Sequence, residues 1–133
     1  DEILELDETH IVGAYRFRED ESFYRGHFPG QPVTPGVILV EAMAQTGVVA
    51  FGLYLVLAQG REEELQRGNL TTLFTVIEAV EFAGMVKPGE RVIIRGEKVY
   101  FRKGNLKAKV SMERENGETV ATGVLAGMGV SLQ

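Results

Sequence analysis

The sequence predicts an α+β fold in which an antiparallel sheet wraps around one long central helix. The first half of the chain contains a long apolar segment, 42–60, without a charged residue, which is typical of a helix that is buried on all sides. The second half contains β-type segments joined by short turns, which predict an antiparallel sheet. Both apolar surfaces are buried if the sheet curls around the helix.

Length and composition fit one folded unit. The chain has 133 residues, 44% of them apolar, and a net charge of −5. We expect a single domain over residues 1–133, because this length supports one hydrophobic core. The acidic balance argues against nucleic acids and membrane surfaces as partners, since both require a basic surface. No cysteine is present, which excludes disulfides, thiolate metal sites and a cysteine nucleophile.

Two segments bear on location. The acidic start DEILELDETH lacks the basic and apolar regions of a signal peptide, so we expect a cytoplasmic protein. Segment 42–60 approaches the length of a membrane span, but it contains glutamine and glycine and has few basic neighbours. We expect it to form the buried axis of the domain and not to insert into a membrane.

The elements of the first half follow from its apolar pattern and its prolines. His10–Phe17 is expected to form a short strand. The prolines and glycines of 26–35 are incompatible with regular structure. Thr34 is a good N-cap residue, and Pro35 suits the first helical position, where its missing N–H costs nothing. From there the helix is expected to run to about Ala58.

Three turn signals divide the second half: Pro88-Gly89, Lys103-Gly104-Asn105 and Asn116-Gly117. Between them, apolar residues alternate with polar ones in the period of a half-exposed strand, most clearly from Leu106 to Met112. In the last strand we expect Val120, Val124, Met128 and Val130 on one face and mostly small residues on the other. The expected strands are Thr71–Phe82, Arg91–Arg102, 105–112 and Val120–Val130.

The segment GHFPGQPVTPGVILVEAMAQTG, residues 26–47, contains two candidate reactive groups. His27 lies in its rigid, proline-rich part, which suits either a catalytic imidazole or a structural loop histidine. Glu41 lies among apolar residues of the expected helix. A carboxyl group in such surroundings is costly to ionise and can act as a general acid. If the first helical turns are exposed, Glu41 instead contacts water.

The start of the helix offers a third reactive element. The N–H groups of Gly36 and Val37 lack acceptors within the helix and lie at its positive end. They suit a carbonyl oxygen that becomes negative, although at most helix starts such groups meet water or a cap. Gln45 lies four residues after Glu41 and shares its helix face. Together these groups suit proton removal beside a carbonyl and loss of a leaving group from the next carbon.

Other kinds of site find no support in the sequence. The chain has no G-x-S-x-G nucleophile motif, no P-loop and no dinucleotide fingerprint. Its two histidines and scattered acids lack the spacing of metal ligands. His10 has no orienting group in view, so we interpret it as a structural or surface residue.

The stretch GHFPGQPVTPGVILVEAMAQ strongly resembles the signature of the FabZ-type 3-hydroxyacyl-[acyl carrier protein] dehydratases, which have the hotdog fold. Weaker resemblance covers nearly the whole chain. It implies a lyase of fatty-acid biosynthesis that converts 3-hydroxyacyl thioesters on acyl carrier protein into trans-2-enoyl thioesters, with no metal or cofactor. Within the signature, Phe28 and Val37 belong to the expected oxyanion and substrate-binding set.

The resemblance also implies roles for individual residues. His27 removes a proton from C2, the N–H of Gly36 holds the thioester oxygen, and Glu41 assists the C3 hydroxyl to leave as water. Gln45 orients Glu41. The implied assembly is a homodimer, or a trimer of such dimers, in which His27 of one subunit meets Glu41 of the other.

The chain departs from the family pattern after Phe82, where family members carry basic residues that are thought to dock the carrier. Here the sequence continues Ala83-Gly84-Met85-Val86. We hypothesise that a basic window, residues 91–109, contacts the carrier instead, and a solvated strand face is the alternative. The cations of this window are Arg91, Arg95, Lys98, Arg102, Lys103, Lys107 and Lys109.

Two other functions stay open at this point. Another hotdog enzyme, such as a thioesterase or a hydratase, would act on CoA esters. A non-catalytic module would keep the fold and only bind acyl chains or their carrier. Intact His27 and Glu41 favour the dehydratase over both, and isomerisation to a 3-enoyl product remains a further activity that the residues allow.

Overall fold

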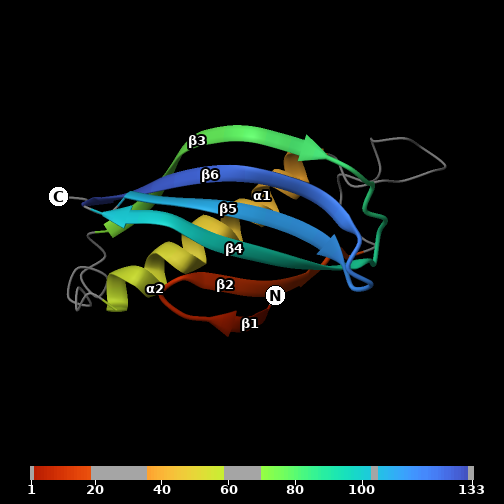
Figure 1. Cartoon of the computed structure of the whole chain (residues 1–133), viewed down its shortest axis with the longest axis horizontal. Coiled ribbons are helices and arrows are strands. Elements are labelled where there is room, and N and C mark those ends of the chain that lie inside the picture. Colours follow the sequence, from red (N-terminus) through yellow and green to blue (C-terminus); the bar gives the residue numbers. More distant parts are fainter. Residues whose placement is uncertain (1, 19–35, 59–69, 103–104, 132–133) are drawn as a thin grey trace.

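The structure is a computed structural model that describes residues 2–18, 36–58, 70–102 and 105–131. In these residues a six-stranded antiparallel sheet curves around one long helix, which confirms the predicted α+β architecture (Figure 1). The elements are β1 (Glu2–Leu6), β2 (His10–Arg16), α1 (Gly36–Ala44), η2 (Gln45–Ala50), α2 (Phe51–Ala58), β3 (Leu70–Phe82), β4 (Arg91–Arg102), β5 (Asn105–Arg114) and β6 (Thr119–Ser131).

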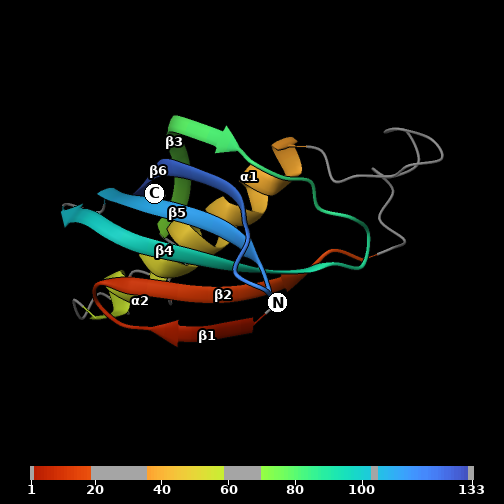
Figure 2. The same cartoon turned by 45° about the vertical axis from the view of Figure 1, so that its right-hand side comes forward.

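The sheet has the strand order β1-β2-β4-β5-β6-β3, so β1 and β3 form its two edges (Figure 2). Every neighbouring pair is antiparallel. The ends of β4 and β5 pair at Arg102 and Asn105, as the predicted reversal requires, although residues 103 and 104 lie outside the described residues. The pairs β1–β2, β4–β5 and β5–β6 are therefore local, whereas β2 pairs with β4 and β3 with β6 across longer gaps in sequence.

Local turn chemistry fixes the two other predicted reversals. Gly89 and Gly117 have φ values of 82° and 91°, in the left-handed region that glycine adopts at little cost. At the β5–β6 turn the N–H of Gly117 donates to the carbonyl oxygen of Arg114 at 2.9 Å. Both predicted turns are confirmed.

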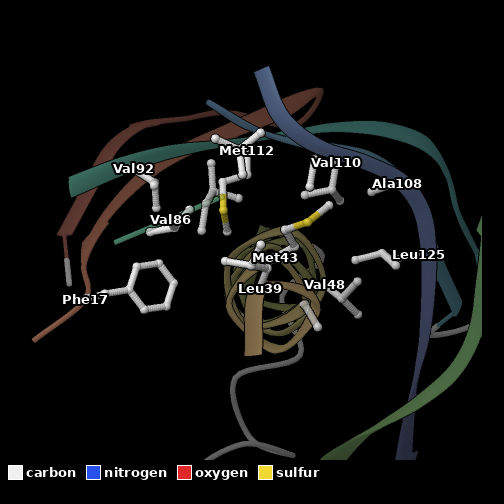
Figure 3. Close-up of a cluster of buried hydrophobic side chains, with 14 residues drawn as sticks. Phe17, Leu39, Met43, Val48, Val86, Val92, Ala108, Val110, Met112 and Leu125 are labelled. Atoms are coloured by element: carbon white, nitrogen blue, oxygen red, sulfur yellow. The ribbon is translucent and has the colours of Figure 1, made fainter. Parts of the chain in front are cut away.

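The core lies between the helix and the concave face of the sheet (Figure 3). Leu39, Met43 and Val48 project from the helix toward the strands and are almost fully buried. From β5, the four apolar residues that alternate with polar ones are buried as predicted: Leu106, Ala108, Val110 and Met112.

On β6 the structure shows which face turns inward. Ala121, Gly123 and Leu125 are buried, whereas Val124 is only half-buried, and Val120, predicted on the same face as Val124, is fully buried instead. A methyl group added at Gly123 would lie 2.8 Å from Cγ2 of Val80, so a small residue is required for β3 to pack there. Beyond Val120, the face with many small residues therefore packs against the core. The small residues let neighbouring elements approach β6 closely, which larger side chains would prevent.

The helix occupies the predicted span but is not a regular α-helix. Its middle third, Gln45–Ala50, has the wider i→i+5 bonding of a π-helix, which the sequence did not reveal. Thr34 and Pro35, the predicted N-cap and first helical position, lie outside the described residues. By length and composition the helix could cross a membrane. Instead Met43 and Phe51 are fully buried against this protein's own strands.

The strand β1 was not predicted. All five of its residues are exposed, and its sequence EILEL does not alternate regularly between apolar and polar residues. It is held by main-chain pairing with β2, and Asp7 shapes the turn between them. The Asp7 carboxylate accepts hydrogen bonds from the N–H groups of Thr9 at 2.7 Å and of His10 at 2.9 Å.

Candidate active site

Glu41 and Gln45 form the polar pair that the sequence predicted on one face of the helix. The side-chain amide of Gln45 donates a hydrogen bond to Oε1 of Glu41 at 2.9 Å. Both side chains are exposed in the single chain. The burial expected for Glu41 is therefore not met within one chain, and the alternative, a carboxyl group open to solvent, describes it.

A cavity of about 390 Å³ lies beside this pair, between the helix and the β1–β2 edge of the sheet. Glu41 and Gln45 form part of its polar lining, and most of the remainder is apolar. Tyr15 packs edge-on against Phe17 with ring centroids 4.8 Å apart, which holds this wall in place. Its lining is completed by Glu2, Ile3, Ile38, Ala42, Thr46 and Ala50.

The start of α1 lies on the N-terminal side of Glu41. A helical side chain leans back toward the helix N-terminus, so the Glu41 carboxyl group lies over the turn that contains Val37. The N–H groups of that first turn, which lack acceptors within the helix, and the carboxyl group therefore share one end of the helix. The side chain of Val37 lies outside the described residues.

Gly36 has a packing role that the sequence did not suggest. A methyl group added there would lie 3.1 Å from Cζ of the Phe82 ring, so the glycine lets the end of β3 approach the helix start. In the structure the Phe82 ring occupies the space beside Cα of Gly36. The backbone N–H of Gly36 is the group that could still donate a hydrogen bond to a substrate.

His27 and Phe28 lie outside the described residues, so their predicted roles stay predictions. Sequence reasoning also missed Ile3 and Tyr15, which line the cavity. Ile3 belongs to the unpredicted strand β1, and no local signal in the sequence brings that strand to the helix. Tyr15 was expected only as a residue of the β2 strand.

The other histidine, His10, does not line this cavity and is the first residue of β2. Nε2 of His10 lies 3.2 Å from Oε1 of Glu5, and Nδ1 lies 2.9 Å from Oδ1 of Asp7. The hydrogen bond to Glu5 raises the pKa of His10 above its usual value, and Asp7 adds to the effect. The sequence argument that His10 has no partner is therefore wrong, whereas its interpretation as a surface residue agrees with its exposed position.

Half of the described cations of the basic window form ion pairs with the chain's own acids. Arg91, Arg95 and Lys107 form ion pairs with acidic side chains at 2.9–3.3 Å. Arg102 stacks over a tyrosine ring, 4.6 Å from its centroid. Lys103 lies outside the described residues. Within the described part, the three ion-paired cations would have to lose an internal partner before they could meet an acidic one.

No group of three or more His, Cys, Asp or Glu side chains in the described ranges 2–18, 36–58, 70–102 and 105–131 is arranged to hold a metal ion. The polar groups described at the site offer proton transfer and hydrogen bonding. Glu41 can give or take a proton, Gln45 can orient it, and the first turn of α1 can donate to an oxyanion.

Comparison with known families decides which proteins share this arrangement. A family model described as the FabA-like domain matches residues 1–125, nearly the whole chain. The chain belongs to this family. Among its curated FabA-like relatives, the FabZ 3-hydroxyacyl-[acyl-carrier-protein] dehydratase of Acetivibrio thermocellus is 40% identical over 92% of this chain and 77% of its own length. The resemblance to FabZ-type dehydratases that the motif indicated is confirmed.

Solved structures support the hotdog architecture of this FabA-like chain. A variant of the fluoroacetyl-CoA-specific thioesterase FlK matches with a TM-score of 0.70 and 17% identity, covering 97% of this chain and 90% of that one. The dehydratase heterocomplex ApeI:P from Xenorhabdus doucetiae matches with a TM-score of 0.69 and 14% identity, covering 96% and 80%. At these identities the likeness shows the fold and not the reaction.

Proposed function

We propose that this FabA-like chain is a carbon–oxygen lyase of fatty-acid biosynthesis. It removes water from 3-hydroxyacyl groups carried on acyl carrier protein and forms trans-2-enoyl thioesters. The observation that carries the proposal is the Glu41–Gln45 pair, beside an apolar-walled cavity and one turn from a helix start. The FabZ names of relatives that span most of the chain support the same substrate and reaction.

The reaction needs one base, one acid and one oxyanion donor. In the proposed sequence His27 takes the proton from C2, and the N–H of Gly36 holds the thioester oxygen as negative charge develops. Glu41 gives its proton to the C3 hydroxyl, the C3–O bond breaks, and water leaves as the C2–C3 double bond forms. His27 ends protonated and Glu41 ionised, so one proton must pass back to Glu41 before the next turnover.

Gln45 keeps the carboxyl group in position for this step. Its amide N–H occupies Oε1 of Glu41, which directs the other oxygen of the carboxyl group to the substrate. Val37 and Phe28 complete the proposed binding set through the helix start and the loop before it. These groups supply every proton transfer of the reaction, so the proposal includes no metal and no cofactor.

We further propose that two chains assemble to complete each site. Within one chain the Glu41 side chain is exposed, and the edge strand β3 has no partner on its outer side among the described residues. Large apolar side chains are exposed along and just after β3, with Ile77 and Phe82 at 52% and Met85 at 62%. Pairing of β3 with its copy would cover this surface and satisfy the edge, either in a dimer or in a trimer of dimers.

The function is tested by measuring water loss from 3-hydroxyacyl chains on acyl carrier protein and on CoA. Glu41→Gln and His27→Ala should each lower kcat by about 10²–10⁴-fold, the usual contribution of a general acid or base. Glu97→Gln, an exposed carboxyl group on the outer side of β4, and His10→Gln are matched controls that should keep parental turnover.

Three outcomes would overturn this assignment. Release of free thiol without water loss would indicate a thioesterase, and preference for CoA esters would indicate a CoA-dependent hydratase. Absence of turnover in the parental protein with every chain length would favour a non-catalytic binding module.

Sharing of the site between chains is tested by mixing two inactive variants. If His27 of one subunit works with Glu41 of the other, a His27→Ala and Glu41→Gln heterodimer contains one intact site. Random reassociation should then restore about a quarter of parental activity, since half the dimers are mixed and one of their two sites is intact. No restored activity in a preparation shown to contain mixed dimers would contradict a shared site.

The docking surface and the location of the protein belong to the same proposal. The basic window remains a candidate surface for the acidic carrier, and Arg102→Glu combined with Lys103→Glu should weaken carrier binding in a salt-dependent way. Unchanged binding would remove the window from the proposal. We also propose that the protein is cytoplasmic, which cell fractionation tests.

A further inference from the structure

The central helix contains a π-helical segment, Gln45–Ala50, which we call the wide turn. A wide turn changes the direction of the side chains after it relative to those before it. In a regular α-helix, residues that face the same way recur every three or four positions. Here a buried residue recurs at every fourth position from Leu39 through Met43 to Leu55, and four residues per turn is more than the 3.6 of an α-helix. The wide turn therefore absorbs one extra residue.

That extra residue aligns the two halves of the helix. With 3.6 residues per turn, Leu55 would point about 160° away from Leu39 in an uninterrupted α-helix. One extra residue in a turn removes about 100° of rotation and leaves the two side chains about 60° apart. Leu39 and Leu55 are both buried in the structure, with exposures of 2% and 4%. Without the wide turn, one half of the helix would turn its apolar face away from the sheet.

The wide turn packs closely against the sheet at two glycine residues, Gly47 and Gly96. A methyl group added at Gly47 would lie 2.5 Å from Cγ2 of Val110, far closer than side-chain atoms approach each other. A methyl group added at Gly96 on β4 would lie 3.2 Å from Cα of Gly47. Figure 3 shows Val110 pointing from β5 toward the helix. The helix backbone therefore rests directly on the sheet at this point.

The seated turn also carries one member of the active pair. Gln45 is the first residue of the wide turn, and it donates to Glu41 in the α-helical turn just before it. Any rotation or lift of the wide turn changes the position of the Gln45 amide relative to the Glu41 carboxyl group. Thr46 is held similarly, since a methyl group added at Gly13 on β2 would lie 2.9 Å from its Cγ2.

We propose that Gly47 is a positioning residue for the reaction: its contact with Gly96 and Val110 holds the wide turn at the depth and rotation that let Gln45 orient Glu41. This inference rests on the proposed dehydration for its kinetic consequence. Its structural part, the control of the wide turn by Gly47, does not depend on any activity.

The test is Gly47→Ala, with Gly52→Ala as the matched control. The added methyl group at Gly47 meets stiff, buried Val110, whereas the same group at Gly52 meets only Leu106 Cδ2 at 3.8 Å, an ordinary contact. We expect Gly47→Ala to lower kcat at least tenfold with KM changed less than twofold. Gly52→Ala should keep parental kcat and KM. The double variant Gly47→Ala, Val110→Ala removes the collision and should recover most of the lost kcat.

Amide hydrogen exchange over residues 45–50 gives a readout independent of activity. Gly47→Ala should increase exchange in this segment, and the double variant should reverse the increase. Parental exchange and parental kcat in folded Gly47→Ala overturn the inference, and so does a kcat that the double variant fails to restore. Absence of dehydration in the parental protein defeats the proposed function instead, and the exchange result still decides the role of Gly47.

A milder variant covers the case in which Gly47→Ala does not fold. Val110→Ile adds one methylene group against the same glycine from the opposite side. The inference predicts faster exchange in 45–50 and a lowered kcat for this variant as well. Parental values of both would overturn it.

Discussion

The two halves of the central helix differ in what they present to solvent, although both bury apolar side chains against the same sheet. α1 contributes Leu39 and Met43 to the larger core cluster, and its outer face carries Glu41. α2 contributes Phe51 and Leu55 to a second, smaller cluster, and it contains no ionisable side chain other than a tyrosine. Burial alone therefore does not separate the two halves.

This difference indicates that both halves of the helix contribute to stability, whereas the proposed chemistry depends on α1. Any well-fitting apolar residue can stabilise the inner face of either half. Of the two halves, only α1 combines a helix start, a carboxyl group and an adjacent cavity. A substitution should therefore affect either turnover or stability, according to the half and the face on which it lies.

The strongest test of this division is Phe51→Ala in α2. The ring is fully buried, and truncation of a buried phenylalanine typically costs about 3–5 kcal/mol of stability. We expect that loss in denaturant unfolding, with kcat per folded molecule unchanged at low temperature. Leu57→Ala, in the same half but 44% exposed, is the control and should change stability little.

If Phe51→Ala left stability intact, or if it lowered kcat as strongly as Glu41→Gln, the proposed division between the halves would fail. Activity should be measured well below the unfolding transition of the variant. Otherwise loss of folded protein would imitate a catalytic effect.

A smaller effect is expected from Gln45→Met at the junction between the halves. Methionine has a similar length but no N–H to donate, so the hydrogen bond to Glu41 is lost. Because Glu41 is protonated when it acts as the acid, this hydrogen bond joins neutral groups and contributes about 0.5–1.5 kcal/mol, so we expect kcat to fall by up to about tenfold. Thermal unfolding should stay near the parental midpoint because Gln45 is exposed.

Steady-state kinetics separates this role from simple binding. An orienting residue affects kcat, whereas a residue that only binds substrate affects KM. A raised KM with parental kcat in Gln45→Met would assign Gln45 to substrate binding and not to the orientation of Glu41.

The smallest effect concerns the β1–β2 turn, which belongs to neither half. The pKa of His10 is raised above 6.5 when folded, chiefly by Glu5, so its stabilising effect is lost as pH rises through the folded pKa. Hydrogen bonds from Thr9 lower the pKa of Asp7 from 3.8 to about 2, so its effect is lost as pH falls below 3.8 toward 2. The turn should therefore be most stable between pH 3.8 and 6.5.

Amide exchange in β1 as a function of pH measures this stability. In His10→Gln the loss at higher pH should disappear, while turnover stays parental over the same range. A change in turnover would connect the hairpin to the site and blur the contrast between the two halves.

Much of the fold could be predicted because its signals are local. The alternation from Leu106 to Met112, the Asn116-Gly117 turn and the uncharged helix each specify their own conformation within a few residues. Glu41 and Gln45 could be paired for the same reason, since i and i+4 positions of a helix share a face. The motif could supply the roles of His27 and Phe28 only through resemblance.

The sequence by itself determined the kinds of elements, their order, the main turns and the polar pair on the helix. Tertiary structure alone decided that β1 joins the sheet, that the small-residue face of β6 turns inward, that Phe82 fills the space beside Gly36, and that the helix widens at Gln45. Apart from β1, which pairs locally with β2, each of these depends on contacts between residues far apart in the chain. Local conformational preferences do not predict such contacts, because the contacts form only when the sheet closes around the helix.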